Sequence, residues 1–519
     1  MRVLLFHAYL LRGTGSNVYN ASLARALVGA GHEVHLFCQD REAASLGWVD
    51  AVGRWRGRRL EVERLREPVR CTAYLPDTGG LLPVYVADEY EGLRAVPFPE
   101  LADEEIEGYI AANVAAVREV VAAVRPDVGL ANHLVAGPAV LARAGGVAYA
   151  VKIHGSALEY TVRPHRERFI GLAREGLDGA RGVLVGSRHT AESLWEVMGD
   201  PGLPARTRLG PPGVDVAAFR PRAPEDAAAR VRALASRLEA AAGDGRGARE
   251  ATAWAPDAGA PAALRALDPR REPVVGYVGK LIVSKGVDLL LAAWPLVVAA
   301  VPAARLCVVG FGAYRDGLEE LAGALRRADL QAARAIAAAG RALEGGPRSE
   351  LRYLAAFLDG LEGERRDAYL AAAPRAFARV HFTGALAHGD LPDLLPAFAA
   401  QVVPSTFPEA FGMVAAEAAC CGALPLAAAH SGLAEVTARL APALPADLRD
   451  LLGFARGPGA VEEIAAKLVR WLTLQPERRA EASAALAATA RGQFGWERVA
   501  EGVIAAAEGR LDALPAVGP

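Results

Sequence analysis

The segment that most constrains this chain is residues 401–420, QVVPSTFPEAFGMVAAEAAC, where an apolar run gives way to a turn and then to an alanine-rich run. The apolar run is typical of the end of a buried strand, and the proline-flanked turn predicts a loop that leads into a helix. The loop carries Glu409 and the helix carries Glu417. In an α/β sheet, ligands bind at the carboxyl ends of strands, and the next helix points its free N–H groups there. The segment therefore predicts a ligand site in an α/β fold.

The spacing of the two glutamates indicates how they are placed. On one continuous helix they would lie about 80° apart around the axis. The spacing fits better with Glu409 in the loop and Glu417 just inside the helix, so that the two carboxylates meet different hydroxyl groups of one elongated ligand. The alternative is two solvated glutamates on a surface helix, because glutamate is a common helix former.

The length and composition bound the fold class. A chain of 519 residues is longer than one hydrophobic core usually supports and predicts at least two domains. Apolar residues make up 52%, and strand-like segments alternate with helix-like ones, which indicates an α/β protein. The formal net charge of −2 gives no indication of nucleic-acid binding.

The cysteines and the apolar segments bear on where the protein works. Five cysteines without a C-x-x-C pair are typical of a reduced, cytoplasmic protein. The run RVLLFHA at residues 2–8 is short and is explained better by a first β-strand than by a signal peptide. The uncharged stretch 289–304 contains two prolines, so we expect a core helix there and no transmembrane segment. Peripheral membrane contact and the oligomeric state stay open.

Two lysines mark a candidate anion site. Lysine occurs only four times, at positions 152, 280, 285 and 467. The segment PVVGYVGKLIVSKGVD predicts a strand over 274–278 that ends at Gly279 and Lys280, followed by a helix that starts at Lys285. Ammonium groups beside a helix N-terminus are suited to binding a diphosphate. Two ordinary surface lysines are a less attractive explanation in a chain that uses lysine so rarely.

The N-terminal segment predicts a βαβ unit. The first strand is followed by the loop GTGSN at 13–17, a helix over 18–30 and the strand EVHLFC at 33–38. Glycines in such a loop allow a ligand to approach the backbone, although a simple tight turn explains them as well. Farther along, a long helix over 103–124 precedes strands that bring His133 and His154 to their carboxyl ends. A single histidine there is more often a packing residue.

Several of these segments resemble the retaining glycosyltransferases of family 4. The segment PEAFGMVAAEAACCGALPLAA, followed by SGLAEV, is similar to the donor-site E-x7-E motif of that family, and the GK…KG pair is similar to its basic diphosphate motif. GTGSN resembles the glycine-rich loop after the first strand, with GSN where the family usually has GG. LGPPGVDVAAF resembles the family's N-G-V-D-x-x-x-F motif, with Pro212 in place of asparagine.

The resemblance implies the GT-B fold, an α/β architecture of two Rossmann-like domains with parallel sheets that face each other across a cleft. It implies an acceptor domain over 1–210, braced by a C-terminal helix at 492–512, and a donor domain over 273–491. Residues 211–272 are then a linker and an insertion with a helix at 225–242. A second, helical insertion spans about 322–374. A cap, an oligomer contact and an acceptor lid are all open as roles for the two insertions.

The implied reaction moves a hexosyl group, with retention, from a nucleotide-diphospho-sugar to an unidentified acceptor. No cofactor and no metal are implied, and the chain contains no D-x-D triplet. The residues implied to act in the reaction are His154, Lys280, Lys285 and Glu409. Those implied to bind the donor are Gly15, Gly279, Leu386, Ala410, Phe411, Gly412 and Glu417. Those implied on the acceptor side are Asn17, Asp88 and His133.

The resemblance also implies a division of labour within the donor site. The lysines neutralise the diphosphate, while Glu409 and the amides of 410–412 hold sugar hydroxyls. Glu417 takes the ribose hydroxyls, and the backbone at 385–386 lies against the nucleobase. His154 lies near the C6 hydroxyl of the sugar.

Two alternatives stay open beside this hypothesis. One is a nucleotide-sugar epimerase of similar architecture, against which the combination of Lys280 and Lys285 with Glu409 and Glu417 argues. The other is a catalytically silent GT-B partner subunit, for which the departures at Ser16 and Pro212 and the two insertions leave room.

Overall fold

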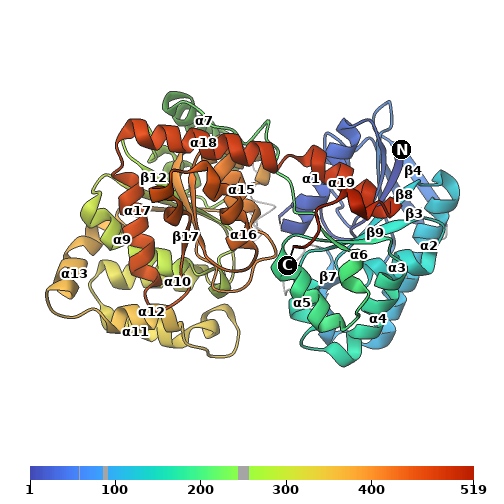
Figure 1. Ribbon diagram of the computed structural model, residues 1–519, viewed down its shortest axis with the longest axis horizontal. Coiled ribbons are helices and arrows are strands. Elements are labelled where there is room, and N and C mark those ends of the chain that lie inside the picture. Colours follow the sequence, from blue (N-terminus) through green and yellow to red (C-terminus); the bar gives the residue numbers. More distant parts are fainter. Residues whose placement is uncertain (14, 58, 86–91, 244–255, 519) are drawn as a thin grey trace. The chain divides into compact units, whose positions relative to one another are not determined.

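The computed structural model describes residues 1–518 except 14, 58, 86–91 and 244–255 (Figure 1). The chain divides into two compact units. The first comprises Met1–Gly213 together with Phe494–Pro519, and the second comprises Val214–Gln493. The sequence prediction set residues 211–272 apart, whereas the structure counts the residues of this range from Val214 onward with the second unit.

The first unit is built on a nine-stranded sheet in its described part, with the strand order β11-β10-β9-β8-β1-β2-β5-β3-β4. All neighbours pair in parallel except β3 and β4. The central strands are buried on both faces, as a parallel sheet covered by helices requires. The strands are β1 (Arg2–Phe6), β2 (Glu33–Phe37), β3 (Ala51–Arg56), β4 (Arg59–Arg64), β5 (Cys71–Leu75), β8 (Val128–Asn132), β9 (Tyr149–Ile153), β10 (Gly182–Val185) and β11 (Thr207–Leu209).

Two helices of the first unit begin with residues that favour a helix N-terminus. The Ser187 hydroxyl accepts a hydrogen bond from the backbone N–H of Thr190 at 3.2 Å, and α5 begins at the next residue. The long helix α2 starts with three acidic residues, which suit the positive end of the helix dipole. The helices are α1 (Gly15–Gly29), α2 (Asp103–Val124), α3 (Gly137–Ala144), α4 (Arg166–Asp178), α5 (Arg188–Met198), α6 (Leu203–Arg206) and α19 (Trp496–Glu508).

A separate pair of short strands, β6 (Leu81–Val84) and β7 (Arg94–Pro97), lies in the region 76–100. From its proline- and glycine-rich sequence, we expect this region either to shape the acceptor side or to form an ordinary hairpin; the hairpin alternative is wrong, because the two strands pair in parallel. Parallel strands cannot be joined by a tight turn and need a crossover connection. Asp88, expected on the acceptor side, lies outside the described residues.

Where it is described, the second unit is built on a six-stranded, fully parallel sheet with the order β14-β13-β12-β15-β16-β17. The chain starts in the middle, at β12, and moves outward in both directions, so this is a doubly wound sheet whose ligand site is expected at the carboxyl edge. The strands are β12 (Val274–Val278), β13 (Arg305–Val309), β14 (Val380–Gly384), β15 (Phe398–Val403), β16 (Leu424–Ala428) and β17 (Gly453–Phe454).

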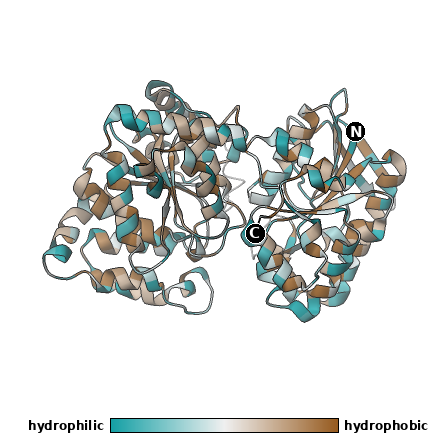
Figure 2. Ribbon diagram, in the orientation of Figure 1, coloured by the Kyte–Doolittle hydropathy of each residue, from teal (hydrophilic) through white to brown (hydrophobic). Residues whose placement is uncertain are grey.

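Helix α9 (Val287–Ala300) lies in the core of the second unit, where the sequence predicts a buried helix. It packs against α13 (Gly363–Phe377) and α17 (Ala460–Leu472). In Figure 2, brown and teal residues alternate around the outer helices of each unit, as in amphipathic helices. Within the described residues, no helix is both long enough and apolar enough to span a membrane.

The two predicted insertions are helical where the structure describes them. The first holds α7 (Pro224–Gly243) and α8 (Ala260–Arg265), which pack against each other. The second holds α11 (Leu330–Ala339), the 3-10 turn η5 (Arg341–Glu344), α12 (Arg352–Asp359) and much of α13. The remaining helices of this unit are α10 (Arg315–Arg326), α14 (Leu391–Leu394), α15 (Met413–Cys420), α16 (Ser431–Leu440) and α18 (Pro476–Gln493).

The C-terminal helix α19 returns to the first unit, where it lies beside α1 (Figure 1). Its first residue, Trp496, is 7% exposed, and its ring meets the ring of Tyr19 edge-on at 5.4 Å between centroids. Gly213 packs so closely on this tryptophan that a Cβ there would lie 2.7 Å from Trp496 Cδ2. The indole is therefore closely packed between Tyr19 and Gly213, and its removal would leave a cavity there.

We expect Trp496→Ala to lower the free energy of unfolding of the first unit by about 3–5 kcal/mol, the usual cost of truncating a buried aromatic side chain. Arg498→Ala removes an exposed side chain from the same helix and should change it by less than about 0.5 kcal/mol. Urea unfolding followed by fluorescence measures both. Equal effects of the two variants would contradict this packing.

Candidate functional site

A lysine-bearing loop, residues 279–286, follows β12 at the carboxyl edge of the second sheet. Its first part is fixed by the turn after β13. The N–H of Leu281 donates to the carbonyl of Phe311 at 2.6 Å, and the N–H of Tyr314 donates to the carbonyl of Leu281 at 2.9 Å. Gly310 must be a glycine, because a Cβ there would lie 1.9 Å from the carbonyl oxygen of Gly279. These contacts hold the backbone that carries Lys280, whose ammonium lies 5.8 Å from the centre of the Phe311 ring.

The second part of the lysine loop is joined to the loop after β15. The carbonyl of Ser284 accepts hydrogen bonds from the N–H groups of Thr406 at 2.9 Å and Phe407 at 3.3 Å. Gly286 has a φ of +65°, and a Cβ there would lie 2.1 Å from the carbonyl oxygen of Pro404. Glycine is thus required at position 286 for two reasons: the backbone has a positive φ, and the two loop backbones approach too closely for a side chain.

This junction brings Lys285 and Glu409 into contact. The Lys285 ammonium donates to Glu409 Oε1, to which the Ser405 hydroxyl also donates, at 2.6 Å. Burial acts to raise the pKa of Glu409. The charge and hydrogen bond of Lys285, the bond from Ser405 and the nearby His430 outweigh it and lower the pKa below its ordinary value. Glu409 is therefore ionised at neutral pH and can accept hydrogen bonds.

The backbone on either side of Glu409 is pressed onto the start of α16. The N–H of Glu409 donates to the Ser431 hydroxyl at 2.9 Å, and the carbonyl of Glu409 accepts from Gly432 at 2.9 Å. A Cβ at Gly432 would lie 2.6 Å from Phe411 Cα. Phe411 is 5% exposed, so its side chain anchors the loop, while Ala410 and Gly412 are partly exposed beside it. Gly412, at a φ of +117°, immediately precedes α15.

Glu417 lies in α15, as the spacing of the glutamates predicts, and its carboxylate is 3% exposed. His388 Nε2 lies 2.7 Å from Glu417 Oε1, and the His388 ring lies 5.4 Å from that of Phe219. Leu386, the predicted nucleobase contact, is partly buried two residues before this histidine. Sequence reasoning missed His388, which lies in the loop after β14.

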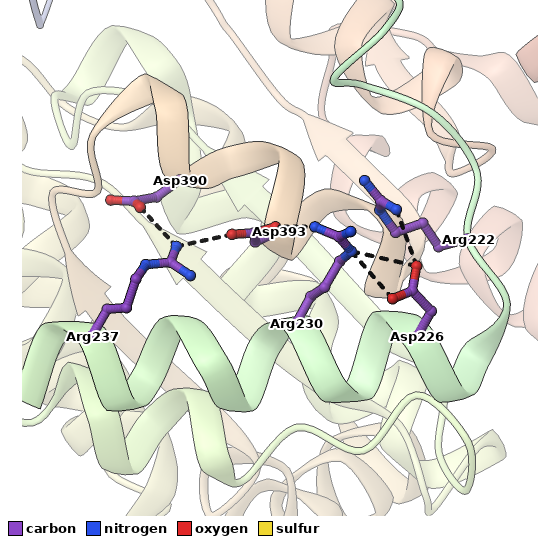
Figure 3. Close-up of polar contacts among 6 residues, drawn as sticks. All are labelled: Arg222, Asp226, Arg230, Arg237, Asp390 and Asp393. Atoms are coloured by element: carbon purple, nitrogen blue, oxygen red, sulfur yellow. Dashed lines mark hydrogen bonds and ion pairs between the residues drawn. The ribbon is translucent and has the colours of Figure 1, made fainter.

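The segment that carries His388 is held by α7 of the first insertion (Figure 3). Arg237 reaches Asp390 at 3.1 Å and Asp393 at 2.8 Å, and Arg230 reaches the other oxygen of Asp393 at 2.9 Å. The 3-10 turn η6 (His388–Asp390) therefore meets α7 through Asp390, and α14 meets the same face of α7 through Asp393, whose carboxylate pairs with both arginines. Each pair is partly exposed and contributes at most about 1 kcal/mol, so the network fixes position more than stability.

In the first unit, His7, His133 and His154 lie together beyond the carboxyl ends of β1, β8 and β9. The ring centroid of His133 lies 4.9 Å from that of His154 and 5.9 Å from that of His7. His154 Nε2 donates to Asn132 Oδ1 at 2.8 Å. Burial, and then the nearby His133, Lys152 and His7, place the pKa of His154 well below its ordinary value. His154 is therefore neutral at pH 7.

The other residues expected in the first unit differ in their surroundings. Both ring nitrogens of His133 are buried and have no hydrogen-bond partner among the described residues. Asn17 is 2% exposed; it donates to the carbonyl of Arg12 at 2.6 Å, and its oxygen lies 3.0 Å from His7 Nε2. The Asn17 side chain thus holds the loop before α1. Gly15 is exposed, and a Cβ there would meet nothing within 4 Å.

Lys152, on β9, is buried without a carboxylate beside it among the described residues. Its ammonium donates to the carbonyl of Gly210 at 2.6 Å and lies 5.4 Å from the centre of the Tyr19 ring. Burial lowers the pKa of Lys152 to about 7. Neither the sequence nor the site suggests a ligand for Lys152.

Within each unit, the structure brings several of the predicted site residues close together. In the second unit, Lys285 and Glu409 touch, and Lys280, Leu386 and Glu417 follow the carboxyl ends of the same sheet. In the first unit, His133 and His154 share one buried polar cluster. A sheet edge that presents two ammonium groups and two carboxylates is able to bind a ligand with both phosphate and hydroxyl groups.

Comparison with known proteins agrees with this chemistry. The family model described as Glycosyltransferase Family 4 matches residues 13–218, and the one described as Glycosyl transferases group 1 matches residues 357–487. A search of curated proteins found no significant match.

Solved structures that resemble the chain carry related descriptions. Sucrose-phosphate synthase from Thermosynechococcus elongatus is 20% identical, with 99% of each chain covered and a TM-score of 0.55. Anabaena Alr3699/HepE in complex with UDP and glucose is 16% identical, with 99% of this chain and 100% of that chain covered and a TM-score of 0.56. The catalytic domain of starch synthase IV from Arabidopsis thaliana, bound to ADP and acarbose, is 12% identical, with 98% of each chain covered and a TM-score of 0.55. At these identities the likeness concerns the fold.

The contact between the lysine loop and the β15 loop predicts a difference between two glycines. Gly286→Ala combines an unfavourable φ with a clash against Pro404, whereas Gly345→Ala, at a φ of +78°, meets nothing within 4 Å. We expect Gly345→Ala to cost about 1–2 kcal/mol of unfolding free energy and Gly286→Ala to cost about 1–3 kcal/mol more. Urea unfolding measures both. Equal costs would contradict the close approach of the backbones.

The buried Lys152 predicts a pH dependence of stability. Between pH 7 and 10 the unfolded chain holds a proton on Lys152 that the folded chain has lost, so stability should rise with pH across this window. Lys152→Met removes this contribution, which amounts to about 4–5 kcal/mol at most. The unfolding free energy of the variant should therefore rise less than that of the wild type between pH 7 and 10. Lys467→Met, at a partly exposed lysine, is the control. Parallel curves for wild type and Lys152→Met would contradict the buried neutral amine.

Proposed function

Because the chain belongs to the GT-B glycosyltransferases of family 4, we propose that it moves a hexosyl group from a nucleotide-diphospho-sugar to an acceptor, with retention of the anomeric configuration. The observation that carries the proposal is the contact of Lys285 with Glu409 at the carboxyl edge of a doubly wound sheet, with Glu417 in the helix that follows. The phosphate, sugar hydroxyl and ribose groups of such a donor would each meet a matching side chain there.

The lysines would hold the diphosphate of the donor. An ammonium group has three N–H donors, so Lys285 can keep its contact with Glu409 and still donate to a phosphate oxygen. When the bond between the anomeric carbon and the phosphate oxygen breaks, negative charge grows on the leaving diphosphate. Lys280 and Lys285, fixed on a rigid loop, would stabilise this charge in the transition state, which is usually the largest catalytic contribution.

The carboxylates would orient the rest of the donor. Glu409 is ionised, and with the backbone of Ala410, Phe411 and Gly412 it would hold hydroxyls of the transferred sugar. Glu417 would take the ribose hydroxyls with the oxygen that does not face His388. Gly279 and the backbone at Leu386 complete the donor site in this proposal.

In the first unit, His154 would meet a sugar hydroxyl. Its Nε2 donates to Asn132, so the Nδ1 of the neutral imidazole is an acceptor. Gly15 leaves room for a ligand beside the start of α1, and His133 would serve the acceptor side.

Retention would follow from attack on the face that the diphosphate leaves. The acceptor oxygen forms its bond to the anomeric carbon as the phosphate oxygen departs, and the hydroxyl proton of the acceptor passes to that phosphate oxygen. We do not assign Glu409 as a nucleophile, because the hydrogen bonds from Lys285 and Ser405 lower its pKa and so make the carboxylate less basic.

Charge neutralisation by lysine makes a divalent cation unnecessary for this step, so we propose a metal-independent enzyme. The five cysteines are buried and unpaired, which supports a reducing compartment such as the cytoplasm.

The proposal predicts a large kinetic effect of Lys285→Ala. After a thermal-shift screen of UDP-, GDP- and ADP-sugars has identified the donor, kcat/KM for that donor should fall about 100-fold or more. Lys467→Ala, which removes another glutamate-paired lysine from the same unit, should leave kcat/KM unchanged. Unchanged donor kinetics in Lys285→Ala would contradict the phosphate assignment. Failure of the wild type to bind or hydrolyse any of these donors would favour a silent partner subunit.

A further inference from the structure

The second insertion supplies a carboxylate to the lysine loop. Glu344, the last residue of η5, accepts a hydrogen bond at Oε2 from the backbone N–H of Val283 at 2.7 Å. Val283 is the first residue of the short 3-10 turn η4 (Val283–Lys285). An N–H group at the start of such a turn has no partner within the turn and needs an acceptor from elsewhere.

Glu344 is itself held in place. Its side chain is only 11% exposed, and its other oxygen, Oε1, accepts from Arg341 Nε at 3.1 Å. The preceding residue, Leu343, packs against the start of α10, where a Cβ at Gly317 would lie 3.2 Å from Leu343 Cδ1 and 2.7 Å from the Tyr314 ring. The 3-10 turn η5 therefore lies close to Tyr314, the residue whose backbone N–H donates to the carbonyl of Leu281.

Three different parts of the second unit thus hold three residues of the lysine loop. The turn after β13 holds Leu281, the loop after β15 holds Ser284, and Glu344 holds Val283 between them. The first two belong to the sheet's own connections, whereas the third comes from an insertion. A carboxylate on a backbone N–H is charge-assisted and roughly twice as strong as a neutral hydrogen bond.

We propose that Glu344 is a positioning residue for binding of the donor's diphosphate, and that this is one role of the second insertion. By fixing the Val283 amide it keeps the turn formed, and the turn directs Lys285 toward Glu409. The proposal rests on the proposed function for the identity of the ligand. Glu344 does not touch the ligand in this account, so its effect passes through the backbone of the loop.

Glu344 also adds a negative charge near an anion site, which by itself would weaken diphosphate binding. The two effects have opposite signs and can be separated by substitution. Glu344→Ala removes both the charge and the acceptor, whereas Glu344→Gln removes the charge and keeps an oxygen that can accept from Val283. The positioning role predicts a loss in Glu344→Ala that Glu344→Gln restores.

The test is titration calorimetry of the full chain with UDP, ADP and GDP. For the nucleotide that the wild type binds, Glu344→Ala should raise Kd about tenfold, and Glu344→Gln should stay within about threefold. Glu350→Ala, which removes an exposed carboxylate from the same insertion, should match the wild type. Hydrogen exchange of the peptide spanning 279–286 should quicken in Glu344→Ala and not in Glu350→Ala.

The outcomes separate this inference from the proposed function. If the wild type binds none of the three nucleotides, the proposed function fails and this inference with it. If the wild type binds and Glu344→Ala binds equally well or more tightly, only the positioning role is overturned. Where Glu344→Ala also lowers the thermal midpoint, Glu344→Asp keeps the charge on a shorter side chain. It should lose affinity without losing stability, and an unchanged Kd in that variant would equally overturn the role.

Discussion

The contact between the Lys285 ammonium and the Glu409 carboxylate depends on a backbone feature. The two residues are 124 positions apart, and they meet because Gly286 lets the loop after β12 touch the loop after β15 at Pro404. Neighbouring parallel strands place these two loops at the same sheet edge, and hydrogen bonds to Ser284 join them. The ion pair thereby lies where a ligand with both phosphate and hydroxyl groups can bind, with the lysine suited to a phosphate and the glutamate to a hydroxyl.

The loops around the contact of Lys285 with Glu409 are also held in place by neighbouring elements. The loop with Glu409 is pressed onto α16, the loop with Lys280 is fixed by the turn after β13, and Glu417 is matched with His388. Rigid loops on a parallel sheet give electrostatic preorganisation, in which charges are already aimed before the reaction begins. The two insertions fit this scheme, since one contacts the His388 segment through α7 and the other contacts the lysine loop through Glu344 (Figure 3).

Sequence reasoning located the parts of the site that are local in the chain. The strand at 274–278 and the helix at 103–124 match β12 and α2, and Glu409 and Glu417 lie in a loop and a helix as their spacing predicts. It missed His388 and Glu344 because each meets its partner across a distance of 29 or 61 residues, which strand order and insertion packing decide. It also missed the parallel pairing of β6 with β7, and it gave no sign that Asn17 is buried. Such contacts depend on tertiary structure, which periodicity and motif spacing do not specify.

The most direct test of the account is a crystal structure of the chain with the nucleoside diphosphate that binds it. The account predicts the diphosphate within hydrogen-bond distance of Lys285 Nζ, with the ribose hydroxyls on Glu417. A nucleotide bound away from these two side chains, with the contact of Lys285 and Glu409 undisturbed, would contradict it.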